Sequence, residues 1–468
     1  MKFGGTSVED PQAFRRVAKI VQAHAQMRPV IIVSAMSGVT DALLQSLQMA
    51  MWGELEQATS TLEVHFERHL NVATSLLSAR EVARLESAVE SARRQICGLL
   101  RKVSTRMRLE FLEDTVVSYG ERLSAELLAA VLCADGLPAK LIDARRCITT
   151  EETHGGAQPL VRETEDRTRR ELGPLVEAGQ IPVLGGFIAA TKTGKTTTLG
   201  RGGSDYTAAL IGAALRTREI QIWTDVSGVL TADPRLVRVA RTIPCLSYRE
   251  AAELAYFGAK VLHPKTIQPA VERGIPVRVC NSHRAKDEGT LIFSGSEFVP
   301  HTAKAIAHKT GITVVQITSA RMLGAYGFLR TIFEIFDRHR TVVDVVTTSE
   351  VSVSLTLDDT RALGEILTEL RGLGTVEVEE RRAIICVVGE GLRTTPGVAA
   401  RVFATISDIN VSLVSLGASN VNLTFVIDEE RVREAVARLH FAFFEQEVES
   451  IHANHQSRTT GGASTGLL

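Results

Sequence analysis

The chain has 468 residues, of which 44% are hydrophobic and 23% charged, and its formal net charge is −1. The length suggests about three domains, the composition is ordinary for a soluble globular protein, and the near-neutral charge implies neither a polyanion nor an anionic membrane as partner. No apolar run approaches the ~18 residues of a membrane span.

The first ~290 residues alternate helix and strand patterns. Residues 11–23 predict a helix, because apolar side chains recur on one face behind Asp10-Pro11. Residues 54–116 are charged and helix-periodic, which predicts an antiparallel helical insertion, and a further helix over 121–134 ends at Asp135-Gly136. Buried strands are predicted at 29–33, 139–142, 182–184, 220–223 and 276–279.

This order of elements predicts an α/β domain whose mostly parallel sheet has helices on both faces. In such sheets ligands bind beyond the carboxyl ends of the strands. Lys2 is followed at once by Gly4 and Gly5 rather than by an apolar core, so we expect no signal peptide. The six scattered cysteines form no C-x-x-C pair, which predicts reduced thiols and a cytoplasmic protein.

The stretch TKTGKTTTLGRGGSDYTAA, residues 191–209, contains two glycine clusters. The first is not a P-loop, because Ala189 stands where that motif needs a glycine. The second, Gly200 to Gly203, precedes Ser204 and Asp205, which we interpret as N-cap residues of a helix over 206–215. A glycine loop opening a helix suits an anion, and Arg201 adds a fork for carboxylate or phosphate. A capped loop without a ligand explains this stretch equally well.

Other segments are weaker signals when taken singly. Residues 2–7, 34–40 and 223–228 place glycines and hydroxyls beside predicted strands or helices, and each also fits an ordinary turn. His65 and His69 are spaced like zinc ligands, but Phe66 stands where a zinc protease has glutamate. We therefore predict a solvated helix face there and no metal site.

After residue 293 the pattern changes to two units of strand, helix, strand, strand, helix, strand. The first spans 312–380, and the second spans 381–455 with a further strand at 301–309. The tail 456–468 is small and polar, so we expect it to be disordered.

Taken together, the motifs resemble those of the aspartate kinase family. They are KFGGTSV, SAMSGVT, SYGE, GGF, TTTLGRGGSDYTAA, WTDVSGV, TADPR and FGAKVLHP. The two later units resemble that family's paired ACT regulatory domains, of ferredoxin-like βαββαβ fold, and TTSEVSVSLTLD resembles its lysine-sensitive monofunctional branch. The resemblance implies an amino-acid kinase fold over residues 1–293. It also implies transfer of the ATP γ-phosphoryl group to the side-chain carboxylate of L-aspartate, which opens the route to lysine, threonine and methionine.

The resemblance assigns roles to individual residues. The implied catalytic residues are Lys2, Asp205 and Lys260. The implied substrate-binding residues are Ser34, Thr40, Glu121, Phe187, Arg201 and Ser204. The implied nucleotide-binding residues are Gly4, Gly5, Gly202, Gly203, Thr224, Asp225, Leu230, Arg235, Lys260 and Val261. Mg²⁺ would accompany ATP, bridging its phosphates, and we predict no protein metal site.

The resemblance also implies feedback inhibition by lysine and a homodimer or tetramer assembled through the ACT units. The implied effector residues are Met322, Ala325, Phe328, Leu329, Val343, Asp344, Thr348, Ser349 and Glu350. The alternatives are a kinase for glutamate or a nucleotide, a catalytically inactive ligand sensor, and threonine as the inhibitor.

Three positions depart from the family pattern. Leu230 stands where an aromatic residue often packs on adenine, and Ala325 stands where the lysine-sensitive branch often has a hydroxyl. Only Met1 precedes Lys2, where the family usually has several apolar residues of a first strand. We therefore expect a chain extended upstream of Met1 to be more active and more stable.

Overall fold

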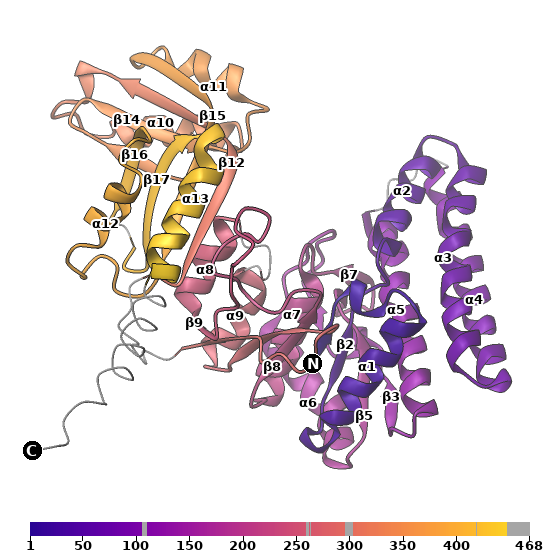
Figure 1. Ribbon diagram of the computed structural model, residues 1–468. Coiled ribbons are helices and arrows are strands. Elements are labelled where there is room, and N and C mark those ends of the chain that lie inside the picture. The colour runs from indigo at the N-terminus through magenta and orange to yellow at the C-terminus, as the bar shows by residue number, and fades with distance from the viewer. Residues whose placement is uncertain (105–109, 259–261, 263, 295–302, 418, 447–468) are drawn as a thin grey trace, which may run out of the picture. The chain divides into compact units, whose positions relative to one another are not determined.

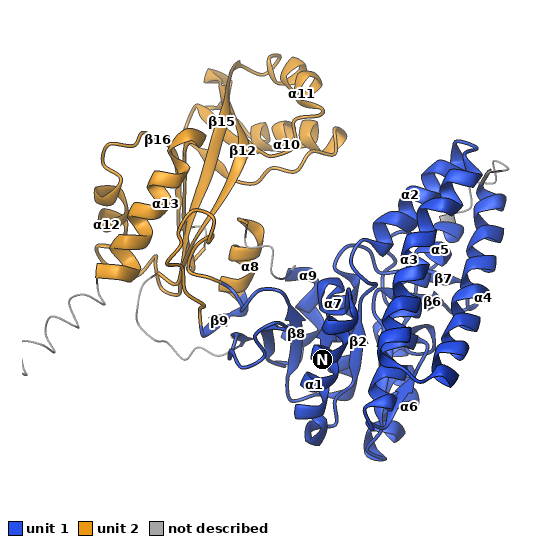
Figure 2. Cartoon of the chain, turned by 45° about the vertical axis from the view of Figure 1, so that its right-hand side comes forward, with its two compact units in different colours: residues 1–229, 244–248, 261–295 blue, residues 230–243, 249–260, 296–468 orange. Residues whose placement is uncertain are grey.

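A computed structural model describes residues 1–104, 110–258, 262, 264–294, 303–417 and 419–446. The predicted tail at 456–468 lies outside these residues. The chain divides into two compact units (Figure 2). Unit 1 comprises residues 1–229, 244–248 and 261–295, and unit 2 comprises residues 230–243, 249–260 and 296–468.

Unit 1 is built on an eight-stranded sheet in the order β3-β5-β2-β1-β8-β10-β11-β9. Neighbouring strands are parallel except β10 and β11, which confirms the predicted mostly parallel sheet. The strands are β1 Lys2–Phe3, β2 Ile31–Val33, β3 Ala139–Leu141, β5 Ile181–Gly185, β8 Ile220–Thr224, β9 Cys245–Ser247, β10 Val277–Asn281 and β11 Thr290–Phe293. The two-residue β1 lies at the centre of the sheet, which puts Lys2 at the edge where ligands bind.

Helices cover this sheet, and two of them project from it. They are α1 Pro11–Ala23, α2 Val39–Met51, α3 Leu55–Leu76, α4 Ala79–Ser104, α5 Glu110–Ala134, α6 Val161–Glu177, α7 Gly203–Leu215 and α9 Pro264–Glu272. The α1 limits match the prediction because Asp10 accepts a hydrogen bond from Ala13 N at 2.7 Å and Pro11 fits the first turn. Figure 1 shows α3 and α4 as the predicted long antiparallel pair.

Helix α5 is longer than predicted. The sequence placed residues up to 116 in the helical insertion and began a separate helix at Glu121, whereas one helix runs from Glu110. Its buried face already includes Leu112, Val116 and Val117, so the apolar stripe has no break at which the helix would end. Glu121 therefore lies in the middle of a packed helix.

A three-stranded sheet, β4-β6-β7, adjoins the main sheet in unit 1. Its strands are β4 Thr149–Thr150, β6 Ile188–Thr191 and β7 Thr196–Thr198. Gly194-Lys195 thus forms the turn between two antiparallel strands, and all three threonines of β7 are buried. This geometry confirms that GKT leads into a strand and is not a P-loop.

Unit 2 contains a six-stranded antiparallel sheet in the order β13-β14-β12-β15-β17-β16. Its strands and helices are β12 Ala305–Thr318, β13 Val346–Thr348, β14 Ser352–Leu357, β15 Thr375–Val388, β16 Val411–Leu416, β17 Asn422–Asp428, α8 Tyr248–Tyr256, α10 Phe328–Arg338, α11 Leu363–Leu370, α12 Val398–Thr405 and α13 Val432–His440. Strands β12 and β15 each run through both repeats. They pair with each other along their length, from Ala305 with Val388 in the second repeat to Thr318 with Thr375 in the first. The strand expected at 301–309 does join the second repeat from Ala305 onward, and β15 runs through the predicted limit at 380.

Two segments from the first ~290 residues pack within unit 2. Thr231 Oγ1 lies 2.9 Å from His440 Nε2, and Ile306 N donates to Thr231 O at 2.8 Å. On α8, the fully buried Glu250 accepts hydrogen bonds from Lys304 Nζ and from Glu390 N. The TADPR segment and the helix preceding FGAKVLHP thus contact the ACT-like repeats directly.

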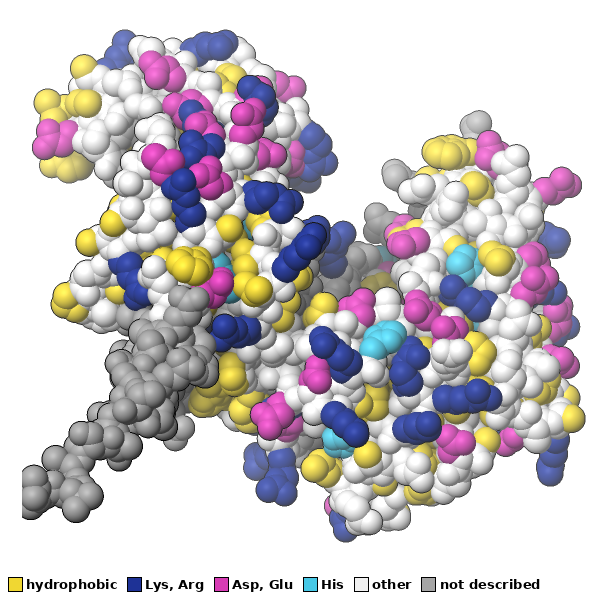
Figure 3. All heavy atoms as spheres, viewed as in Figure 1, with side chains coloured by type: hydrophobic (Ala, Val, Ile, Leu, Met, Phe, Trp, Pro, Cys, Tyr) yellow, Lys and Arg dark blue, Asp and Glu magenta, His cyan; other side chains and the backbone are white. Residues whose placement is uncertain are grey.

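Acidic and basic side chains intersperse on the visible face of each unit (Figure 3), as the near-zero net charge predicts. Within the described ranges, no helix is long and apolar enough to cross a membrane. All six cysteines are free thiols.

Candidate active site

A cavity of about 470 Å³ opens at the carboxyl end of the unit 1 strands. Its walls come from β1, the residues after β2, helix α5, the β5–β6 turn and the start of α7. Eight predicted substrate and catalytic residues line it, namely Lys2, Ser34, Thr40, Glu121, Phe187, Arg201, Ser204 and Asp205, together with Gly202 and Gly203. A cavity of this size suits a small ligand.

Lys2 and Asp205 form an ion pair at the floor of the cavity. Lys2 Nζ lies 2.8 Å from Asp205 Oδ1, and the two side chains are only 11% and 16% exposed. The contact lacks the direction of a hydrogen bond. Because both groups are nearly buried, the carboxylate holds the ammonium at one place in the cavity.

The predicted N-cap role of Ser204 and Asp205 is wrong. Helix α7 begins at Gly203, and its N-cap is Gly202 in the left-handed region at φ 73°, with no side-chain cap. Both side chains therefore lie in the first helical turn and face the cavity. The uncapped N–H groups and the helix dipole make this end of α7 suited to an anion.

Two glycines allow close backbone approach around this helix end. A Cβ on Gly5 would lie 2.8 Å from Ala35 O, and one on Gly203 would lie 2.6 Å from Phe187 Cδ2. A larger residue would require the backbone at Ala35 to shift in the first case and the Phe187 ring to shift in the second. The glycines therefore leave backbone N–H groups accessible where side chains would otherwise cover them.

Glu121 is a buried carboxylate with a free oxygen. The residue is 4% exposed, and Oε2 has no hydrogen-bond partner among the described residues. Burial raises the pKa of Glu121 to about 8. Such an oxygen in a cavity wall is poised to accept a cationic donor, since an unpaired buried carboxylate is otherwise costly.

Phe187 has a left-handed backbone, at φ 65°. This conformation is strained for an aromatic residue and persists only where neighbours hold it. Here Phe187 N donates to Thr207 Oγ1 on α7 at 2.9 Å, and Leu199 N donates to Phe187 O at 2.9 Å. These bonds fix the GGF turn against the start of α7.

Comparison with known proteins identifies the family to which this chain belongs. Residues 1–281 match the amino acid kinase family, and residues 385–443 match the ACT domain. The lysine-sensitive aspartokinase 3 of Escherichia coli strain K12 is 36% identical, over 95% of this chain and 98% of its own length. The chain belongs to the aspartokinase family.

Solved structures agree with this placement. Escherichia coli aspartokinase III in complex with aspartate and ADP superposes with a TM-score of 0.80 at 36% identity, covering 95% of this chain and 99% of that chain. The same enzyme in complex with lysine and aspartate gives a TM-score of 0.79, with the same coverage of both chains. As an aspartokinase, this chain transfers a phosphoryl group from ATP to aspartate.

The predicted nucleotide-binding residues are spread over both units. Thr224 ends β8 in unit 1 and Asp225 directly follows it, but neither residue lines the 470 Å³ cavity. Leu230 and Arg235 belong to unit 2. The Arg235 side chain is 86% exposed and pairs with Asp233. Lys260 and Val261 lie outside the described residues, so the structure does not test their roles.

The predicted effector residues of the aspartokinase lie together on unit 2. Met322 ends a short 3-10 helix, and Phe328 and Leu329 begin α10 behind Gly327 at φ 82°. Ala325, Ser349 and Glu350 are exposed, and Val343 is partly buried. Thr348 ends β13 and is exposed. Asp344, also among the implied effector residues, already has a partner: its side chain is 2% exposed and pairs with Lys309.

Sequence reasoning missed Asp114, which also lines the cavity. Asp114 precedes Glu121 by seven residues on α5, so both carboxylates lie on one helical face. The seven-residue spacing could have indicated this shared face. The predicted helix began only at Glu121, however, so Asp114 was not placed on the same helix.

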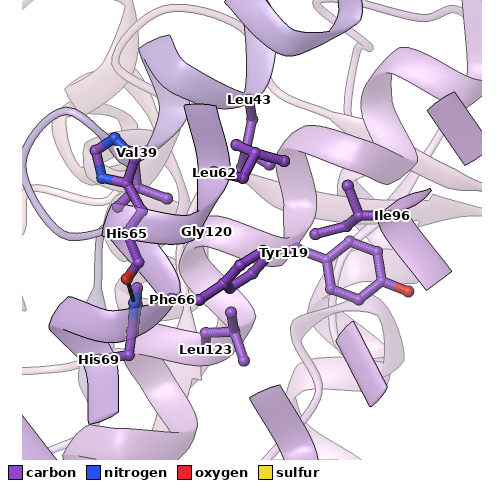
Figure 4. A pocket seen from close by; sticks show the side chains of 10 residues that line it. All are labelled: Val39, Leu43, Leu62, His65, Phe66, His69, Ile96, Tyr119, Gly120 and Leu123. Carbon is purple, nitrogen blue, oxygen red and sulfur yellow. Dashed lines mark hydrogen bonds between the residues drawn. The ribbon is translucent and has the colours of Figure 1, made fainter. Parts of the chain in front are cut away.

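The prediction of a solvated face at His65 and His69 is also wrong. His69 is 1% exposed, and its Nδ1 lies 2.7 Å from His65 O. Figure 4 shows both histidines with Phe66 at a small cavity between α2, α3, α4 and α5. Burial lowers the pKa of His69 to about 4, so the ring is neutral. Neither histidine belongs to a group of three potential metal ligands among the residues the structure describes.

Proposed function

We propose that the 470 Å³ cavity binds aspartate beside the phosphates of ATP. The observation that carries the proposal is the unpaired Oε2 of buried Glu121 in the same cavity as the Lys2–Asp205 pair. Glu121 accepts the substrate ammonium, and Arg201 binds the substrate α-carboxylate through its fork. Ser34, Thr40, Phe187 and Ser204 shape the remaining wall.

The reacting group needs no general base. The side-chain carboxylate of aspartate is ionised at neutral pH, so it attacks the γ-phosphorus directly. The reaction requires alignment and neutralisation of phosphoryl charge. Lys2, positioned by Asp205, and Lys260 supply positive charge, and the glycine backbones at Gly4-Gly5 and Gly202-Gly203 donate N–H groups.

The donor set of the cavity fits a magnesium ion bound mainly by phosphate. No group of three carboxylate, histidine or cysteine side chains gathers in the described part of the chain. Mg²⁺ usually takes one or two carboxylates plus phosphate oxygens and water, and Asp205 supplies a carboxylate in the first turn of α7. When bound, Mg²⁺ would neutralise charge on the β- and γ-phosphates.

We infer that Thr224, Asp225, Leu230, Arg235 and Val261 contribute to the nucleotide site. Thr224 ends a parallel strand, where ligands of such sheets bind. Leu230 replaces an aromatic packing partner for adenine, so adenine packing rests on aliphatic contacts.

Lysine is the proposed feedback inhibitor, and it acts through the first ACT repeat. The lysine complex of the related Escherichia coli enzyme supports this assignment. We also propose that the enzyme works as a homodimer or tetramer assembled through its ACT repeats, and in the cytoplasm.

Trapping of the acyl phosphate with hydroxylamine tests the reaction. The wild-type chain with MgATP should give the hydroxamate with aspartate and not with glutamate. A hydroxamate with glutamate alone would identify a different amino acid kinase, and none with either would leave the ligand-sensor alternative.

A further inference from the structure

A second buried carboxylate lines the proposed substrate cavity, and its contacts differ from those of Glu121. Asp114 lies two turns before Glu121 on the same face of α5, and its side chain is 1% exposed. Whereas Glu121 has a free oxygen, both oxygens of Asp114 accept hydrogen bonds from the protein. A carboxylate this deeply buried requires such partners.

Three donors from two different segments converge on Asp114. Thr198 Oγ1, at the end of β7, donates to Oδ1. Gly155 N donates to Oδ1 at 3.1 Å and to Oδ2 at 3.3 Å. His154 Nδ1 lies 2.6 Å from Oδ2, and its ring contacts Phe111. Asp114 thereby ties the 151–157 segment and the end of β7 to helix α5.

The tied segments support the loop that carries Arg201. Ala157 N donates to Thr198 O at 2.8 Å. A Cβ on Gly200 would lie 3.3 Å from Gly156 Cα and 3.4 Å from Gly155 O. Gly200, directly before Arg201, therefore packs on the segment that Asp114 holds.

We propose that Asp114, with His154 and Thr198, is a positioning group for the aspartate side of the cavity. It holds the Gly155-Gly156 segment so that Gly200 and Arg201 stay where the substrate α-carboxylate binds. This inference rests on the proposed function, because it assigns Arg201 to that carboxylate. Asp114 does not touch the reacting atoms, since its own oxygens are occupied by the protein.

A positioning role predicts a selective kinetic change. A charged acceptor binds these donors more strongly than a neutral amide does. Asp114→Asn should therefore raise KM for aspartate by at least ~10-fold and change KM for ATP and kcat by less than ~2-fold, because the α-carboxylate contact is equally strong in ground and transition states. Asp143→Asn is the matched control: Asp143 accepts four hydrogen bonds from Arg145 in unit 1 but does not line the cavity. Asp143→Asn should change neither KM for aspartate nor KM for ATP.

Hydrogen exchange gives a second readout that does not depend on the reaction. In the ligand-free enzyme, amides of residues 151–157 and 198–204 should exchange at least ~5-fold faster in Asp114→Asn than in the wild type, with α1 and α6 unchanged. If Asp114→Asn does not fold, Thr198→Val and Thr198→Ser replace it. Valine removes the hydroxyl donor and should raise KM for aspartate, and serine keeps the donor and should restore it.

The outcomes separate the proposals. Unchanged KM for aspartate and unchanged exchange in a folded Asp114→Asn would overturn the positioning role. An equal rise in both KM values, or the same change in Asp143→Asn, would also overturn it by pointing to general destabilisation. If the wild type forms no aspartyl hydroxamate, the proposed function fails, and the exchange experiment still decides whether Asp114 holds the loop.

Discussion

Lys309 Nζ lies 3.0 Å from Asp344 Oδ2, so a carboxylate of the proposed effector site already holds an ammonium of the chain itself. The Tyr256 hydroxyl donates to the other oxygen of Asp344, and Lys309 also pairs with Asp358 at 2.7 Å. Tyr256 ends helix α8, four residues before Lys260. The proposed effector site and the segment leading to a predicted catalytic lysine therefore share one hydrogen-bonded cluster within unit 2.

Removing the Lys309 ammonium should strengthen inhibition by lysine. In Lys309→Met most of the apolar side chain remains and Asp344 loses its internal ammonium partner while keeping the Tyr256 hydroxyl. An incoming ammonium therefore no longer competes with Lys309. A charged hydrogen bond contributes ~1.5–3 kcal/mol, and the partial exposure of Lys309 reduces this, so the half-inhibitory lysine concentration should fall ~5- to ~20-fold. Dose–response curves of hydroxamate formation measure it. Arg361→Met, which breaks an exposed pair with Asp359 on the same unit, is the control. Weaker inhibition in Lys309→Met would show that Lys309 supports the effector instead of competing with it.

Glu350 should be required for inhibition but not for catalysis. The side chain is exposed near Ser349 on the unit 2 surface, where it is available for an effector α-amino group. Glu350→Ala should keep kcat within ~2-fold of wild type and raise the half-inhibitory lysine concentration by at least ~10-fold, a loss of ~1.4 kcal/mol. The missing hydroxyl at Ala325 predicts weak inhibition even in the wild type. Inhibition of the wild type by threonine and not by lysine would show a real site with a different ligand.

Asp205 should be needed for turnover and not for the fold. Asp205→Ala removes the carboxylate that positions Lys2, and we expect kcat to fall by at least ~100-fold, about 3 kcal/mol of transition-state stabilisation. Because the α7 N-cap is Gly202 and not Asp205, the melting temperature should change by no more than a few degrees. Asp166→Ala, at an 80% exposed position on α6, is the control. Near-normal turnover in a folded Asp205→Ala protein would refute the assignment.

Aspartate binding should be coupled to the ionisation of Glu121. Burial raises the pKa of Glu121 from 4.5 to about 8 in the folded chain, so below pH 8 the carboxyl must release a proton to bind the substrate ammonium. KM for aspartate should therefore fall by up to ~10-fold per pH unit from pH 6 to pH 8 and level off above it. Glu121→Gln should raise KM and flatten the profile, as initial rates at varied aspartate would measure. A steep profile that survives in Glu121→Gln would assign the titration to another group.

The raised pKa of Glu121 also affects the stability of the fold: a rise in pH that favours aspartate binding lowers the free energy of unfolding. Between pH 4.5 and about 8 the folded chain keeps a proton on Glu121 that the unfolded chain has lost. The contribution of Glu121 to the free energy of unfolding therefore falls as pH rises through this range. Glu121→Gln should remove that contribution in chemical denaturation without substrate.

His69 should destabilise the fold in acid. Burial lowers its pKa from 6.5 to about 4, so between these values the unfolded chain binds a proton that the folded chain excludes. The free energy of unfolding should fall by ~2 kcal/mol between pH 7 and pH 5 from this group alone. His69→Gln should lose this dependence in urea denaturation, while His283→Gln, at an exposed position, should keep it. Equal pH slopes for His69→Gln and wild type would contradict the burial argument.

The sequence alone determined the elements whose signals are local. Helix α1 matches its predicted limits, because amphipathic periodicity and the residues at its ends act within a few positions of one another. The order of elements predicted a mostly parallel α/β sheet, and the resemblance of the long motifs implied the amino-acid kinase fold.

Only the tertiary structure decided which distant groups touch. The shared strands β12 and β15 pair residues some 57 to 83 positions apart, from Thr318 with Thr375 to Ala305 with Val388, and two segments of the kinase sequence pack in unit 2. The same holds for side chains: Asp114 with His154 and Thr198, and Asp344 with Lys309 and Tyr256. A carboxylate is free or occupied according to donors brought from elsewhere in the chain, and burial sets its pKa. Neither property is local, so the sequence pattern at Asp114, Glu121 or Asp344 could not distinguish a ligand-binding oxygen from one that the protein itself satisfies.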